Sequence, residues 1–120
     1  MAKQQMQFFM GVKRSVGEME SEKKGEKITW DNVIINRMSE IDSEKNEGAI
    51  GYEILAPLKI KYEEFEDVTS MTYEKFLEKA SENLMQPIVV MFGEMRGIGE
   101  NRKADVMLFR FVGKDGQIDF

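Results

Sequence analysis

The sequence predicts a mainly β fold, a five-stranded barrel with one helix between its third and fourth strands. Five stretches either alternate apolar with polar residues or are rich in β-branched and aromatic residues, as strands with one buried face are. One segment, between Thr72 and Pro87, instead repeats its apolar residues at helical spacing. The 120 residues, 42% of them hydrophobic, suffice for a single domain over residues 1–120 with its own core.

The first strand is predicted over residues 5–15. Phe8, Met10 and Val12 share one parity and should face the core. Because neighbouring side chains of a strand point to opposite faces, Phe9 should be exposed on the other face. The glycine that follows Met10 is a point where the strand can bend or bulge.

The second strand is predicted over residues 27–38, with ITWDNVIINRM at its centre. Val33 and Ile35 suit the core, which places Trp30 on the opposite face. Residues 16–26, between the first two strands, are polar and charged and include two glycines. We therefore expect them to form a long hairpin loop.

The third strand is predicted over residues 50–62. Pro57 cannot donate a backbone hydrogen bond, so a break, a bulge or an edge is expected there. Lys59 and Lys61 then face outward. The acidic residues 63–67 that follow are expected to be a connection.

The helix follows this connection. Thr69 and Thr72 are its two candidate N-caps, because a threonine hydroxyl can accept a hydrogen bond from a free N–H of the first turn. Pro87 is expected to end it. Its apolar stripe consists of Tyr73, Phe76, Leu77, Ala80 and Leu84.

The last two strands are predicted over residues 88–96 and 103–112, with a glycine-containing loop between them. Residues 114–120 follow a predicted turn. They form either a short C-terminal tail or an extra strand paired back on the sheet.

This order of strands and helix resembles the OB-fold, in which a helix commonly links the third and fourth strands of a small barrel. The segment FFMGVKRSVGEMES…GEKITWDNVIINR is similar to the start of phage and plasmid single-stranded DNA-binding proteins. The C-terminal DGQIDF resembles the acidic, phenylalanine-ended tip by which bacterial proteins of this kind recruit partners, although it lacks their run of acids, penultimate proline and linker. The resemblance implies a homo-oligomer that binds single-stranded DNA in replication or conjugation and contacts replication proteins.

Binding a single strand without sequence preference requires exposed aromatic rings for base stacking and basic groups along the phosphates. In an OB-fold the faces of the second and third strands and the loops beside them form the groove. The candidate residues that meet these requirements are Phe9, Lys13, Arg14, Trp30, Lys59, Lys61, Arg96, Arg102 and Lys103.

Several classes of function are excluded by composition. The chain has no cysteine and no histidine, which removes disulfides, thiolate metal sites and serine–histidine catalytic triads. We therefore expect a binding protein without cofactor or metal, not an enzyme. No apolar run is long enough to span a bilayer and no signal peptide is evident, so a cytoplasmic protein without a membrane partner is expected.

The net charge of −5 is unfavourable for binding nucleic acid. Many of the acidic residues fall in residues 63–67 and in the helix, so a positive groove can exist if the helix lies away from it. Three alternatives stay open: an acidic interaction module or DNA mimic, a structural phage protein that assembles through strand edges, and a metal enzyme built on Asp31, Glu53 and Glu94. The choice between DNA and RNA is also open.

Overall fold

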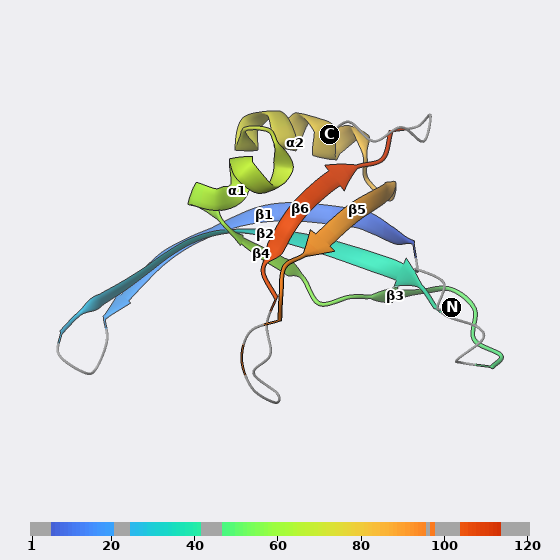
Figure 1. Cartoon of the computed structure of the whole chain (residues 1–120), viewed down its shortest axis with the longest axis horizontal. Helices are drawn as coiled ribbons and strands as arrows, with labels where there is room; N and C mark the ends of the chain where they lie inside the picture. The colour runs from blue at the N-terminus through green and yellow to red at the C-terminus, as the bar shows by residue number, and fades with distance from the viewer. Residues whose placement is uncertain (1–5, 21–24, 42–46, 96, 98–103, 114–120) are drawn as a thin grey trace.

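The computed structural model describes residues 6–20, 25–41, 47–95, 97 and 104–113. Within these residues the chain forms one antiparallel sheet of six strands, and two helices cover one side of it (Figure 1). In chain order the elements are β1 (Gln7–Glu20), β2 (Lys27–Glu40), β3 (Tyr52–Ile54), β4 (Leu58–Lys61), α1 (Tyr62–Thr69), α2 (Tyr73–Glu82), β5 (Pro87–Phe92) and β6 (Val106–Phe111).

The strands are ordered β3-β2-β1-β5-β6, and β4 pairs with β2 on the same edge as β3. This confirms the mainly β prediction but not the closed five-stranded barrel with a single helix. The predicted third strand is divided at residues 55–57, where Pro57 lies, into β3 and the four-residue β4. Because the chain turns into α1 directly after β4, this strand packs near β6 without pairing with it, and the sheet stays open.

The acidic residues 63–67 are helical, contrary to the predicted connection. Phe65, Val68 and Thr69 on one side of α1 are buried against the sheet, while Glu63 and Glu64 lie in the first turn, where the helix dipole favours negative charge. This amphipathic pattern spans only two turns. Its charged residues therefore predict a connection when the sequence is considered alone.

Of the two candidate N-caps, Thr72 is the one that caps α2, because its hydroxyl accepts a hydrogen bond from the backbone N–H of Lys75 at 3.3 Å. Phe76 and Ala80 of the predicted stripe are buried. Leu77 is 43% exposed, and Leu84 lies beyond the helix and is exposed as well, so that part of the stripe is wrong. The helix ends well before Pro87, which is instead the first residue of β5.

The predicted face of Phe9 is also wrong, because a β-bulge lies beside it. Phe9 pairs with Arg37 and Gly11 pairs with Asn36, so Met10 is an extra residue in β1. The bulge changes the alternation and turns Phe9 into the core, where it is 0% exposed. There it packs edge-on against three rings of α2 and β6: Phe76, Phe109 and Phe111.

The two helices are both too short and too polar to cross a membrane, and no other helix occurs in the described part of the chain.

Candidate nucleic-acid interface

The ends of β1 and β2 project beyond the rest of the sheet as a two-stranded arm, made of residues 16–20 and 27–31 (Figure 1). Residues predicted as a loop thus continue β1 as far as Glu20. The strand β4 pairs with β2 only as far as Asn32, opposite Lys61. At the base of the arm the sheet therefore narrows from three strands to two.

Strand pairing sorts the side chains here onto two faces, because residues opposite each other in neighbouring strands share a face. The inner face is the one on which Val33, Ile35 and Ile60 are buried beneath the helices. The outer face is the opposite one. Three successive rows of paired residues on the outer face lie near the base of the arm: Lys13–Ile34–Lys59, Ser15–Asn32–Lys61 and Gly17–Trp30.

The outer face is basic. Lys13, Lys59 and Lys61 are all exposed, and the three rows contain no acidic residue. The sequence-based prediction that Lys59, Lys61 and Trp30 point away from the core is confirmed. The structure also brings them into three successive rows, and Lys13, predicted for the same patch, lies on this face as well.

Trp30 lies over the backbone of β1. A Cβ atom on Gly17, its cross-strand partner, would come within 2.1 Å of the indole ring, so only glycine leaves room for the ring in this position. The indole Nε1 donates a hydrogen bond to Ser15 Oγ at 3.3 Å. With one side resting on β1 and 37% of its surface exposed, Trp30 has the placement of a stacking platform.

Arg14 belongs to the inner side, away from the three lysines. Its Nε and Nη2 donate hydrogen bonds to the two carboxylate oxygens of Asp31 at 2.8 and 2.6 Å. The guanidinium carbon lies 3.7 Å from the centre of the Tyr62 ring, in a cation–π contact. Arg14 is therefore already engaged by two neighbours, and the prediction that it lies in one patch with the lysines is wrong.

This ion pair shifts the pKa of both partners. Hydrogen bonds from Arg14 lower the pKa of the Asp31 carboxyl below its ordinary value, and the same bonds raise the pKa of Arg14. Tyr73, whose ring lies 6.0 Å from that of Tyr62, has its pKa raised by burial. The inner side thus holds an ion pair and packed rings, whereas the lysines of the outer face form no ion pair with any residue that the structure describes.

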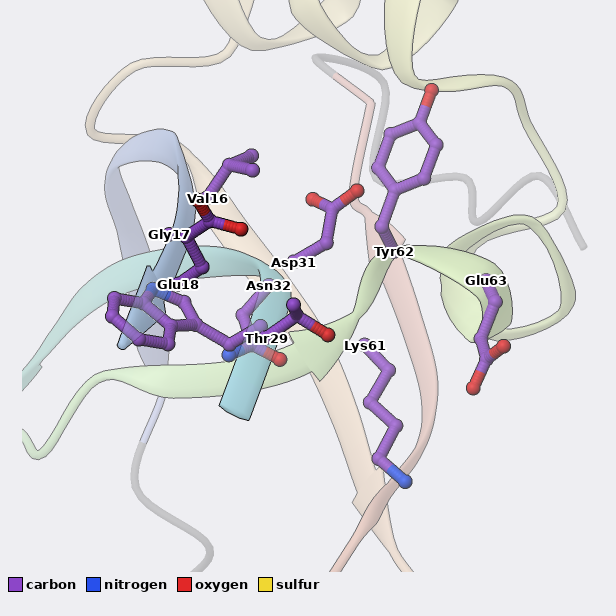
Figure 2. A pocket seen from close by; sticks show the side chains of 10 residues that line it. Val16, Gly17, Glu18, Thr29, Asp31, Asn32, Lys61, Tyr62 and Glu63 are labelled. Atoms are coloured by element: carbon purple, nitrogen blue, oxygen red, sulfur yellow. The ribbon is translucent and has the colours of Figure 1, made fainter. Parts of the chain in front are cut away.

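A groove of about 850 Å³ lies at the base of the arm. The edge of β2, at Thr29, Asp31 and Asn32, lines one side, and Lys61 and Tyr62 line the other. Figure 2 shows that Tyr62 points to the same side as Asp31, whereas Lys61 points the opposite way. The groove therefore opens beside the free edge of β2, between the inner and outer faces.

The remaining predicted site residues do not contribute to this surface in the described structure. Phe9 is buried in the core. Arg96, Arg102 and Lys103, together with the tail at residues 114–120, lie outside the described residues. The inner ion pair of Arg14 was missed because it depends on the register of the arm, and its sequence signal is only an arginine and an aspartate on neighbouring strands.

No cluster of three acidic side chains that could hold a metal ion occurs among the residues that the structure describes. Of the three acids considered for such a site, Asp31 is bonded to Arg14, whereas Glu53 lies on β3 and Glu94 follows β5. The chain matches no protein-family model, no curated protein and no solved structure.

Proposed function

We propose that this protein binds single-stranded DNA with little sequence preference and is not an enzyme. The strand crosses the outer face of β1, β2 and β4, where Trp30 stacks on a base and three lysines contact phosphates. The observation that carries the proposal is that Lys13, Lys59 and Lys61 share this face with Trp30, in rows free of acidic residues.

The separation of charge across the sheet supports the proposal despite the net charge of −5. The two helices on the other side of the sheet carry a large share of the acids, which are exposed there: Glu63, Glu64, Glu66, Asp67, Glu74, Glu78 and Glu82. The arm acids Glu18 and Asp31 also point to the inner face. A polyanion approaching the outer face meets local positive charge, with the sheet between it and these acids.

The position of the surface also fits an OB-like arrangement that remains open on one side. In an OB-fold the second and third strands form the oligonucleotide-binding face. Here these are β2 and β4, which supply Trp30, Lys59 and Lys61. The proposal includes a cytoplasmic role in replication or conjugation with replication proteins as partners, which only the resemblance of the sequence implies.

The acidic-module alternative rests on one observation, the exposed carboxylates of α1. Glu63, Glu64, Glu66 and Asp67 occupy one short helix and all are exposed. If this surface mimicked DNA, the protein would bind a basic partner and would not retain an oligonucleotide at low salt. The binding experiment therefore separates the two functions.

The test measures binding of a labelled oligo(dT) by fluorescence anisotropy at several salt concentrations. We compare Lys59→Gln/Lys61→Gln with Lys75→Gln/Lys79→Gln, which changes the net charge equally but alters exposed lysines on α2. Loss of two phosphate contacts should reduce the slope of log K against log salt by about 1.4, since each contact to a single strand contributes about 0.7. Wild-type affinity and slope in the β4 variant would refute the proposal.

Trp30 reports on the stacking step, because it is the only tryptophan. Its fluorescence should be quenched by oligo(dT), and a duplex of equal length should compete poorly, since its bases are already stacked. Trp30→Leu should weaken binding by about 5- to 150-fold, the range that corresponds to one stacked base. Trp30→Phe keeps a ring and should retain much of the affinity.

A further inference from the structure

The arm leaves one edge of β2 open. On the edge away from β1, β4 pairs with residues 32–35 and β3 pairs with residues 38–40. Within the described structure no strand pairs with residues 27–31 on that edge. The groove at the base of the arm lies along this stretch, at the point where β4 ends (Figure 2). An open edge of this kind is a template for another strand.

We propose that the occupant of this edge is β2 of a second copy of the chain, paired antiparallel about a two-fold axis at Thr29. Thr29 is the midpoint of the open stretch. The register places Lys27 opposite Asp31 of the second copy and Ile28 opposite Trp30 of the second copy. Two arms then form a continuous four-stranded sheet in the order β1-β2-β2-β1.

Charge complementarity selects this register. Lys27 and Asp31 carry opposite charges, lie at equal distances from Thr29 and share the inner face, so the two-fold axis brings each Lys27 beside Asp31 of the other copy. Within its own chain Asp31 is bonded to Arg14, and Lys27 lies opposite Glu20, so each cross-copy pair extends a row of alternating charges. Moving the axis to Ile28 would place Glu26 opposite Trp30 and remove both pairs. Moving it to Trp30 would bring the second strand onto Asn32, whose edge already pairs with Lys61.

The apolar residues of the arm point to the same partner. On the outer face of the arm, Met19 is 55% exposed and Ile28 is 49% exposed, although a two-stranded ribbon gains little stability on its own. The proposed register sets Ile28 of each copy beside Trp30 of the other, which covers part of both side chains. Lys13, Lys59 and Lys61 remain outside the contact, and the two outer faces become one surface.

The pairing can be tested by cross-linking without nucleic acid, so its outcome is independent of the proposed DNA binding. The chain has no cysteine, so one introduced cysteine is unambiguous. In the proposed dimer the two Thr29→Cys residues face each other, with Cβ atoms about 5 Å apart. The control is Glu18→Cys, on the same row and also exposed, whose copies are three strand spacings apart, about 14 Å. A short bismaleimide should join the Thr29→Cys chains and leave the Glu18→Cys chains largely separate.

Sedimentation equilibrium gives a second, independent readout. The wild-type chain should be a dimer, and Lys27→Glu should raise the dimer dissociation constant by about tenfold or more, because like charges then face each other twice. The control is Glu20→Lys. It places two like charges opposite each other within one arm, because residue 20 is paired with Lys27, and it leaves the open edge of β2 unchanged. The proposal would be overturned if the wild-type chain stayed monomeric over a 100-fold range of protein concentration. It would also be overturned if the Glu18→Cys chains cross-linked as well as the Thr29→Cys chains.

Discussion

Arg14 shows how the neighbours of a residue decide its role. It lies next to Lys13 in the sequence, yet the alternation of β1 sends the two side chains to opposite faces. Lys13 is left exposed on the outer face. Arg14 holds Asp31 through two hydrogen bonds and rests on Tyr62, so it ties β1 and β2 to the start of α1.

The Asp31 pKa provides a measurement of this contact. Because Arg14 lowers it, the stabilisation is fully present above the ordinary aspartate pKa of about 3.9 and is lost as the pH falls through the lowered value. In an NMR titration of the side-chain carboxyl, Arg14→Gln should raise the Asp31 pKa towards its ordinary value. Lys13→Gln removes the same charge from the other face and should leave the pKa nearly unchanged. Equal effects of the two variants would contradict the assigned contact.

At the scale of elements, local patterns explain some boundaries and not others. α2 begins where its cap predicts, because Thr72 meets the first-turn N–H of Lys75 directly. The break at Pro57 likewise follows from a missing donor. The helix α1 and the long arm were not predicted, because short amphipathic and charged segments become ordered only through the sheet and core beside them.

The hydrogen bond that caps α2 should make a measurable contribution to the free energy of unfolding. Thr72→Ala should lower the free energy of unfolding by about 1 kcal/mol, within a range of roughly 0.5–2 kcal/mol, in urea denaturation followed by circular dichroism. Ser81→Ala is the matched control, because the Ser81 hydroxyl donates to the Glu78 carbonyl inside the helix and caps nothing. Its effect should be clearly smaller. A Thr72→Ala chain as stable as wild type would show that this hydrogen bond does not stabilise the helix.

At the scale of the whole molecule, one aromatic cluster joins the helices to both halves of the sheet. Phe9 of β1 contacts Phe76 of α2 and Phe109 of β6, with ring centroids 6.2 and 6.4 Å apart. Phe65 of α1 joins the cluster through Phe76 at 4.9 Å. The same arrangement puts the acidic helices on one side of the sheet and the lysines on the other.

Phe9→Ala tests this arrangement. It should lower the free energy of unfolding by about 3–5 kcal/mol, as expected for a fully buried phenylalanine. Phe8→Ala, at the neighbouring and partly exposed position, removes an edge contact with Tyr52 outside the core cluster and should cost less. Chemical denaturation of both variants shows which of the two phenylalanines faces the core. A larger loss for Phe8→Ala would mean that β1 is not bulged as described.

The sequence by itself determined the features that depend on residues close together in the chain. These are the mainly β class, the two candidate caps of α2, the burial of Val33 and Ile35, and the outward direction of Trp30 and Lys59. Each follows from the alternation of side chains along a strand or from one local hydrogen bond. Neither of these two signals requires knowledge of the partner strand.

Only the tertiary structure decided which face Phe9 takes, what Arg14 binds and whether the sheet closes. The bulge at Met10 shifts every residue before it by one position relative to β2, and a shift of one residue exchanges the two faces of a strand. The contact of Arg14 with Asp31 depends on the register of β1 and β2 after the bulge, where Arg14 is paired with Val33 and Val16 with Asp31. Register and closure are set by which distant strands pair, and that pairing minimises the free energy of the whole core, not of any one segment.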